Sequence, residues 1–329
     1  MKEADRAPLV VFQGVTKVFH QRQSLFSKEG PDVKALDRVN FEIYPGEIFS
    51  LVGESGSGKT TCGRLLVRLE TPTSGQILYE GQSLLDLRRK HNRLFRKKVQ
   101  MIFQDPYQSL NPQLTVFQTI SEPMIVQGYG DHHDRETRVL EILEEVDLEP
   151  AQDFIFRYPH QLSGGQRQRV AVARAMIIDP EFVVADEPVS MLDASIQAQL
   201  LNMLLDLKDH HSLTLLFITH DLASARYVSD RIAVIYRGKI MEHGPTEAVI
   251  QNPLHPYTRA LIQAVPSIER RDEELLSAAC PVDLFSKPVT TGCPFSARCP
   301  DCSAQCEAQE MALKEVEKGH HAACVLYYG

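Results

Sequence analysis

The chain has 329 residues, 43% of them hydrophobic and 24% charged, and its 43 Asp and Glu against 35 Lys and Arg give a formal charge of −8. This length predicts about two domains at roughly 100–200 residues each, and the composition excludes disordered and collagen-like chains. The net negative charge argues against binding to nucleic acid, because such binding requires a cationic face on the protein. No apolar run approaches the ~18–20 residues of a membrane span, and the N-terminus lacks an apolar signal segment. We therefore expect a cytoplasmic protein that only another chain could hold at a membrane.

Strands dominate the prediction for the first third of the chain. Apolar and polar residues alternate within residues 9–52, and the apolar run 48–52 is typical of a buried strand. The other elements predicted here are a surface loop at 21–32, a helix at 59–69, a turn at 71–75 and a strand at 76–79. Residues 88–98 are strongly basic; we interpret them as a solvated helix face, with contact to acidic lipid or a partner as the alternative.

Helices and strands alternate through the middle of the chain. Helical periodicity in a region broken by Pro and Gly predicts a helical subdomain, with helices at 116–126 and 135–146. Further elements are predicted as a helix at 164–178, a strand at 182–186, a helix at 194–210 and a strand at 213–219. Such alternation implies βα units and a mostly parallel sheet. After about residue 250 the composition shifts, which predicts a loop at 252–257 and a linker at 269–274.

A match to the pattern G-x-x-x-x-G-K-[ST] lies between a predicted buried strand and a predicted helix. Its glycines let the backbone curl around phosphates, and successive N–H groups supply positive potential. Lys59 can neutralise the β- and γ-phosphates, and the Thr60 hydroxyl can ligate Mg²⁺. The residues expected around the phosphates are Gly53, Glu54, Ser55, Gly56, Ser57, Gly58, Lys59, Thr60 and Thr61.

Two acidic residues close the predicted strand 182–186. Asp186 can hold Mg²⁺ through water, and Glu187 can orient or deprotonate an attacking water. Acids at strand ends are also commonly solvated turn residues. The combination with a phosphate loop favours the functional interpretation.

The segment Leu162-Ser163-Gly164-Gly165-Gln166 precedes a predicted helix. Ser163 is a natural N-cap, and the two glycines expose backbone N–H groups at the positive end of the helix. Taken alone, this is an ordinary capped helix. The order of the motifs is more specific: the phosphate loop, Gln104, this segment, Asp186-Glu187, Asp193 and His220. In that order, over about residues 9–250, the chain resembles the ABC-type ATPases.

This resemblance implies a fold. It is an α/β P-loop nucleotide-binding domain with a mostly parallel core sheet, an antiparallel β subdomain and a helical subdomain at about 105–178. We expect the nucleotide-binding domain to span residues 1–250 and a small Cys-rich extension to span 251–329.

The resemblance also implies site residues for ATP hydrolysis. Phe19 would stack on adenine, although the family more often uses Tyr and a core position is the alternative. The implied catalytic residues are Glu187, His220 and Gln104, the last two also contacting ATP, and the implied Mg²⁺ ligands are Thr60, Gln104 and Asp186. Two subunits would pack head to tail with ATP between them. Asp193 would contact the partner subunit, and the signature of one subunit would bind the γ-phosphate held by the other through Ser163, Gly164, Gly165 and Gln166.

Three further segments carry a closer resemblance to the oligopeptide, dipeptide and nickel importer ATPases: residues 106–112, 158–161 and 252–261. It implies a subunit that couples ATP hydrolysis to uptake of di- or oligopeptides. Its partners would be a second ATPase (identical or different), two transmembrane permeases and an extracytoplasmic peptide-binding protein, at the cytoplasmic face of the membrane. Alternatives are a nickel or other small-solute importer, a non-transport ABC ATPase, and a module whose tail senses redox state or metal.

Six of the seven cysteines fall in the last fifty residues. A reducing cytoplasm argues against disulfides and for a metal or cluster site. Four thiolates suit a [4Fe–4S] cluster or Zn²⁺, and the importer resemblance implies the cluster on Cys293, Cys299, Cys306 and Cys324. The spacing Cys299-x-x-Cys302 would equally suit zinc, and free or structural thiols are a third possibility. We interpret Cys62 and Cys280 as apolar filler or free thiols.

Overall fold

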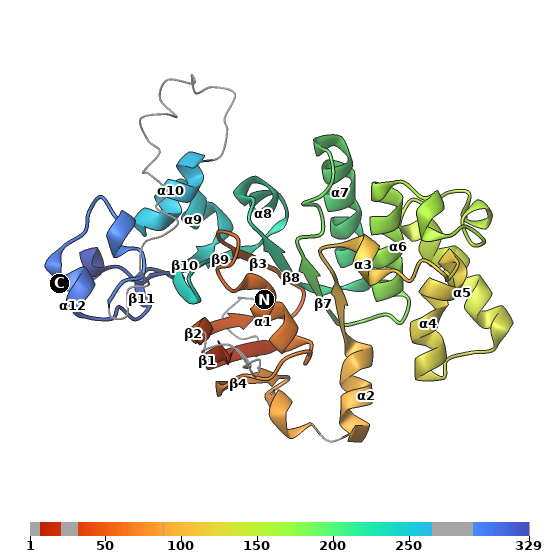
Figure 1. Cartoon of the computed structure of the whole chain (residues 1–329), viewed down its shortest axis with the longest axis horizontal. Helices are drawn as coiled ribbons and strands as arrows, with labels where there is room; N and C mark the ends of the chain where they lie inside the picture. Colours follow the sequence, from red (N-terminus) through yellow and green to blue (C-terminus); the bar gives the residue numbers. More distant parts are fainter. Residues whose placement is uncertain (1–6, 21–31, 88, 265–291, 329) are drawn as a thin grey trace, which may run out of the picture.

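The computed structural model describes residues 7–20, 32–87, 89–264 and 292–328. Three predicted features fall outside these ranges: most of the loop at 21–32, the linker at 269–274 and Cys280. The described chain contains a small antiparallel sheet, a large mixed sheet and a group of helices to one side (Figure 1).

The small sheet lies near the N-terminus and has four strands in the order β2-β1-β4-β5. They are β1 (Val10–Phe19), β2 (Val33–Ile43), β4 (Ser74–Tyr79) and β5 (Gln82–Ser83). All its pairings are antiparallel, and Val10 of β1 lies opposite both Ile43 and Tyr79. This sheet is the expected antiparallel β subdomain.

The large sheet has eight strands in the order β11-β12-β10-β9-β3-β8-β7-β6. Its parallel strands are β3 (Ile48–Val52), β6 (Val99–Ile102), β7 (Phe182–Asp186), β8 (Thr214–Thr219) and β9 (Arg231–Tyr236). Strands β3 and β7 have the predicted bounds and are buried along their whole length. Their continuous apolar runs reflect burial on both faces of a parallel sheet. The prediction of a mostly parallel core is confirmed.

The helices of the nucleotide-binding part are α1 (Lys59–Leu66), α2 (Arg89–Lys98), α3 (Pro106–Ser109), α4 (Val116–Gln127), α5 (His132–Glu145), α6 (Gly164–Met176), α7 (Ala194–His211) and α8 (Leu222–Val228). Each predicted helix is present with shifted ends. Helix α5 begins three residues earlier than predicted because the Asp131 side chain accepts hydrogen bonds from the N–H groups of His133 and Asp134. Helices α4, α5 and α6 lie together on the right of Figure 1.

The large sheet buries different residues on its two faces. Val183 and Ala185 of β7 pack in the cluster that also contains the buried residues of α4 to α7. The alternate residues Phe182 and Val184 pack with α1 and the antiparallel sheet. The pleat of a strand sends successive side chains to opposite faces, so one sheet joins both subdomains.

The C-terminal extension continues the large sheet. Strand β10 (Lys239–Pro245) and helix α9 (Thr246–Gln251) precede it. The described elements of the extension are α10 (Pro256–Ala264), a 3-10 helix (Ser296–Arg298), α12 (Ala304–Ala308), β11 (Lys314–Glu317), β12 (His320–Ala322) and a 3-10 turn (Val325–Tyr327). Strand β12 pairs with β10, and β11 pairs with β12. The predicted loop at 252–257 is wrong at its end, because α10 begins at Pro256, where proline suits a first helical turn.

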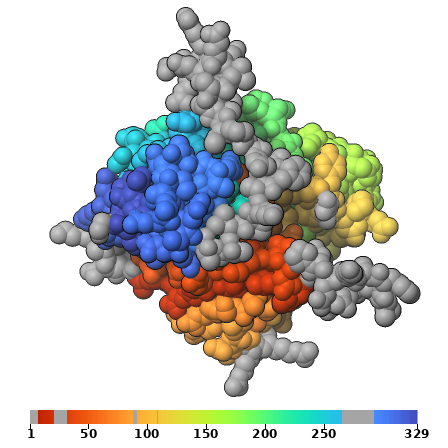
Figure 2. Space-filling view, turned by 60° about the vertical axis from the view of Figure 1, so that its left-hand side comes forward, coloured from red at the N-terminus to blue at the C-terminus, as the bar shows by residue number. Residues whose placement is uncertain are grey.

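The extension also contacts the N-terminal sheet. Glu310 forms ion pairs with Arg38 of β2 and with Lys239 of β10. In Figure 2 the C-terminal segment (blue) lies against the cyan α10 region and above the red N-terminal strands. Throughout the described ranges, no helix has the length and apolar character needed to cross a bilayer.

Candidate functional site

The phosphate loop lies between the end of β3 and the start of α1, as predicted. Two of its glycines have positive φ, 77° at Gly56 and 108° at Gly58, a region that other residues rarely adopt. Gly53 has no room for a side chain, because a Cβ there would lie 2.1 Å from the carbonyl oxygen of Ile235. The loop is therefore held close to strand β9 and needs glycine at these positions.

The Lys59 side chain forms hydrogen bonds with the backbone of the loop. This side chain is buried, and Nζ donates hydrogen bonds to the carbonyl oxygens of Gly53 at 2.7 Å and Glu54 at 2.9 Å. Burial lowers the pKa of Lys59, while the nearby carboxylates of Glu187 and Asp186 act in the opposite direction. An incoming phosphate would offer this ammonium group a stronger acceptor than the two carbonyls.

Two oxygen-bearing side chains face each other next to the loop. Thr60 Oγ1 donates a hydrogen bond of 3.0 Å to Asp186 Oδ1. Asp186 ends strand β7, and burial raises its pKa. A hydroxyl and a carboxylate oxygen are the hard ligands that Mg²⁺ prefers, so the residues present fit this ion.

Glu187 lies at the meeting point of the predicted catalytic residues. Its carboxylate accepts a hydrogen bond of 2.9 Å from Gln104 Nε2 and lies 3.3 Å from His220 Nδ1. Lys59 Nζ is 3.9 Å from its other oxygen. The backbone of Glu187 has a φ of 46°, a conformation that costs energy in a non-glycine residue and is common at functional sites. The three catalytic candidates therefore come together from three strand ends.

The signature segment forms the capped start of α6. The Ser163 hydroxyl accepts a hydrogen bond from the Gln166 N–H, and the Gln166 side chain accepts one from the Ser163 N–H, so Ser163 caps α6 as predicted. A Cβ at Gly165 would come within 2.8 Å of Ile196 on α7. Among the residues described, no hydrogen bond or ion pair joins the signature to the phosphate loop of the same chain. Asp193 is exposed at the N-terminus of α7.

Phe19 is the last residue of β1, with 37% of its surface exposed. Lys17 Nζ lies 4.8 Å from the centre of its ring. This exposure separates Phe19 from the core residues of β1 and leaves a ring face for a planar ligand.

Two residues of the extension contact the phosphate loop, and the sequence motifs did not single them out. The Glu54 N–H donates a hydrogen bond of 3.1 Å to the Tyr257 hydroxyl. Arg298 Nη1 donates to both oxygens of the Glu54 carboxylate, at 3.0 and 3.1 Å. The only sequence signals were that Tyr257 lies inside the importer segment 252–261 and that Arg298 lies between Cys293 and Cys299 of the tail.

Among the described residues of the tail, the thiols of Cys302, Cys306 and Cys324 lie close enough to Cys293 to interact with it electrostatically. Cys293 donates a backbone hydrogen bond of 2.7 Å to the Cys306 carbonyl. Burial raises the pKa of Cys293, and the neighbouring thiols add to this effect. Across the described ranges, no three His, Cys, Asp or Glu side chains are arranged to hold a metal ion. Cys62 is a residue of α1 and is fully buried, as expected of an apolar filler.

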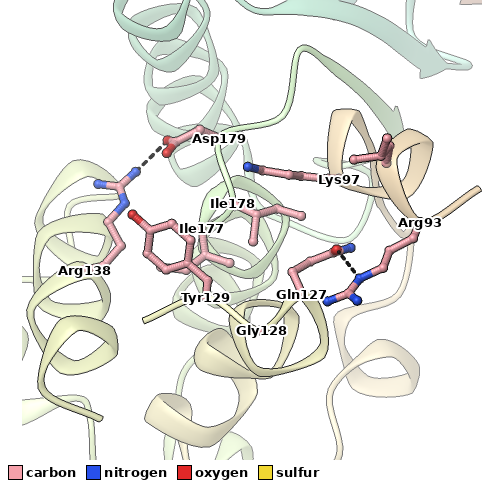
Figure 3. Close-up of a pocket in the computed structure, with 10 residues that line it drawn as sticks. Arg93, Lys97, Gln127, Gly128, Tyr129, Arg138, Ile177, Ile178 and Asp179 are labelled. Atoms are coloured by element: carbon pink, nitrogen blue, oxygen red, sulfur yellow. Dashed lines mark hydrogen bonds and ion pairs between the residues drawn. The ribbon is translucent and has the colours of Figure 1, made fainter. Parts of the chain in front are cut away.

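A separate cavity of about 500 Å³ lies between α2, the turn after α4, α5 and the end of α6 (Figure 3). Arg93 and Lys97 of α2 face it from one side and Arg138 from the other, where Arg138 pairs with Asp179 at 2.9 Å. The predicted basic helix buries Phe95 and exposes Arg93 and Lys97, which agrees with a solvated face. The cavity contains none of the predicted ATP-site residues.

The fold and the grouping of Lys59, Thr60, Asp186, Glu187, Gln104 and His220 define an ATPase of the ABC class. The ABC transporter family model matches residues 36–190, and the model of the oligopeptide/dipeptide transporter C-terminal region matches residues 241–306. Among solved structures, the ATP-binding cassette MJ0796, in a dimeric post-hydrolysis state with ADP and Pi, has a TM-score of 0.64 at 31% identity. That match covers 72% of this chain and 98% of the cassette.

Curated relatives match nearly the whole chain. The oligopeptide transport ATP-binding protein AppF of Bacillus subtilis is 43% identical over 99% of this chain and 100% of its own length. The dipeptide transport ATP-binding protein DppF of Haemophilus influenzae is 40% identical over 97% of each. The chain belongs to this family of ABC transporter ATP-binding proteins that carry the oligopeptide/dipeptide C-terminal region, and it is an ATPase.

Proposed function

We propose that the protein is the ATP-hydrolysing subunit of an importer for di- or oligopeptides. The observation that carries this proposal is the arrangement of Glu187 with Gln104, His220 and Lys59 beside a phosphate loop. The peptide substrate is supported by the match to the oligopeptide/dipeptide C-terminal region and by relatives named for peptide transport.

Each residue of the site then has a task. Lys59 exchanges its carbonyl partners for the β- and γ-phosphates of ATP, and the loop N–H groups bind the same oxygens. Glu187 accepts the proton of the attacking water, and Gln104 and His220 hold the Glu187 carboxylate and the γ-phosphate in place. Phe19 stacks on adenine.

Mg²⁺ would be held by Thr60, Asp186 and Gln104, and it would neutralise phosphate charge during hydrolysis. The direct Thr60–Asp186 hydrogen bond keeps both oxygen atoms at the edge of the phosphate loop.

We infer that the complete site forms between two subunits. The capped N-terminus of α6 presents N–H groups that the phosphate loop of its own chain does not engage, and these groups suit a phosphate. Ser163, Gly164, Gly165 and Gln166 of one subunit would bind the γ-phosphate held by its partner. Asp193 is exposed where it would contact that partner. The second subunit is an identical chain or a related ATPase.

The permease subunits would hold the protein at the cytoplasmic face of the membrane, and an extracytoplasmic binding protein would deliver the peptide. A groove of about 410 Å³ between β6, α4 and α6 suits a permease segment. Its lining includes Leu69 and Val126, with exposed fractions of 56% and 67%, and Phe103, which is next to Gln104. Exposed apolar surface of this kind marks interaction sites. Val126→Asp should abolish co-purification with the permeases while leaving ATP binding intact.

We further propose that the tail binds a [4Fe–4S] cluster through Cys293, Cys299, Cys306 and Cys324, with Zn²⁺ as the alternative occupant. The support is the set of four thiols, three of them buried, within one compact tail. Soft thiolate donors suit both occupants. Anaerobic purification followed by iron, sulfide and zinc analysis distinguishes the two. A tail with neither metal, in protein that is otherwise folded, would refute the proposal.

The transport function is tested by uptake into vesicles that contain this subunit, its partner ATPase and the two permeases, with the peptide-binding protein present on the extracytoplasmic side. We expect ATP-dependent uptake of a labelled dipeptide, lost in Glu187→Gln and retained in Glu144→Gln, which changes an exposed acid on α5. Uptake of nickel instead of peptide would show that the substrate is not a peptide. Co-purification with ribosomes would contradict a transport role.

A further inference from the structure

Three groups of Glu54 in the phosphate loop form hydrogen bonds with residues from two different parts of the chain. Lys59, within the loop's own motif, donates to its carbonyl oxygen. Its N–H and its carboxylate are bound by residues 203 and 244 positions away in the sequence, Tyr257 and Arg298. The ATP site of this chain therefore includes contacts from the C-terminal extension.

Tyr257 is placed rigidly. It lies at the start of α10, is 1% exposed, and packs against Tyr236 and Phe295 with ring centres 4.6 and 5.3 Å away. The tightly packed ring leaves its hydroxyl little freedom, so the hydrogen bond to the Glu54 N–H has a defined direction. This bond fixes one peptide unit at the start of the loop.

Arg298 is held by aromatic rings on the tail side. Its guanidinium carbon lies 5.8 Å from the ring centre of Tyr236 and 5.5 Å from that of Phe295, and Nη1 also donates to the Tyr236 hydroxyl at 3.3 Å. The side chain is 15% exposed and that of Glu54 is 41% exposed. The ion pair is thus partly shielded from water, and one partner is preorganised.

The ion pair between Arg298 and Glu54 matters for ATP binding because Glu54 carries a negative charge within the phosphate loop. A carboxylate in a phosphate loop repels the anionic phosphates of ATP unless a cation neutralises it. Arg298 supplies that cation and also holds the carboxylate in one place. A loop that is ordered before ATP arrives also loses less conformational entropy on binding.

We propose that Tyr257 and Arg298 are positioning residues of the phosphate loop, so that the C-terminal extension sets the affinity for ATP. They contact the loop and not the nucleotide. Their substitution raises the Kd and KM for ATP and leaves the turnover rate at saturating ATP nearly unchanged, since Glu187 and its partners are untouched.

The test is titration of the full-length chain with a fluorescent ATP analogue, together with steady-state ATPase kinetics. Arg298→Ala should weaken binding about 3- to 10-fold, as expected for a partly exposed ion pair. Tyr257→Phe should weaken it about 2- to 5-fold through the lost acceptor. Arg298→Lys should recover most of the affinity because the positive charge remains. The matched control is Arg226→Ala, which removes a bidentate Arg–Glu pair between α8 and α9.

If Arg298 acts by neutralising Glu54, the effects of substituting these two residues on ATP affinity should not be additive. In a Glu54→Gln background, Arg298→Ala should cost much less affinity than in the wild type, because no carboxylate is left to repel phosphate. High salt should also reduce the effect of Arg298→Ala. The proposal fails if Arg298→Ala and Tyr257→Phe both bind the analogue within twofold of wild type. It also fails if they lower turnover at saturating ATP as strongly as they raise KM. Should Arg298→Ala not fold, Arg298→Gln decides the same question.

Discussion

One buried carboxylate, Glu242 of β10, binds two separate segments of the C-terminal extension. Its side chain has no exposed surface, and it accepts hydrogen bonds from the N–H groups of Leu254 at 2.9 Å and His255 at 2.8 Å. The ring Nε2 of His320 on β12 lies 2.8 Å from the same carboxylate. Glu242 thus joins the segment before α10 to the last strands of the tail.

Glu242→Ala leaves three buried donors without their acceptor. Each such loss costs about 1–3 kcal/mol, and water entering the vacated space recovers part of it, so we expect destabilisation of about 3–5 kcal/mol. Glu242→Gln keeps one acceptor oxygen and should cost about 1–2 kcal/mol. Glu247→Ala on the neighbouring helix α9 removes an exposed acid and serves as the matched control.

Urea unfolding followed by far-UV circular dichroism measures these differences, and limited proteolysis reports on the tail. We expect Glu242→Ala to unfold at lower urea and to release C-terminal fragments sooner than either other variant. A loss below about 1 kcal/mol, or unchanged cleavage of the tail, would show that the three hydrogen bonds do not hold the extension in place.

Three further results are expected. Gly53→Ala should weaken binding of the ATP analogue about tenfold or more, because the added Cβ meets the Ile235 carbonyl; binding within twofold of wild type would contradict the packing described. Glu187→Gln should lower hydrolysis at least about a hundredfold and retain ATP binding, and substantial turnover would exclude Glu187 as the base. Burial raises the pKa of Cys299 to about 11, so in metal-free protein its alkylation by iodoacetamide should quicken about tenfold per pH unit from pH 7 to 10. Exposed Cys302 should react first, and peptide mass spectrometry distinguishes the two.

The local parts of the molecule could be predicted from sequence alone. The buried strands at 48–52 and 182–186 are continuous apolar runs bounded by turn residues, and their bounds in the structure are the predicted ones. The cap at Ser163 follows from a side chain and an N–H three residues apart. The phosphate loop is equally local, because glycine spacing by itself defines where the backbone can turn.

The two strands of the tail could not be predicted from sequence patterns. Strands β11 and β12 have four and three residues, and β11 is mostly charged and exposed, so neither carries a periodic signal. They form because β10 offers an unpaired edge whose N–H and C=O groups need partners. Likewise Pro256 and Tyr257 read as a loop, whereas packing against Phe295 makes them the start of a helix.

Local sequence is sufficient to predict the phosphate loop, because the loop depends on neighbours within a few positions. The class of protein and the candidate catalytic residues were instead indicated by the order of several motifs along residues 9–250. The fold was needed to show that Tyr257 and Arg298 reach Glu54, and that Gln104 and His220 both contact the carboxylate of Glu187. Contacts between residues tens to hundreds of positions apart depend on how strands are ordered in a sheet. That order is set by the packing of the whole chain.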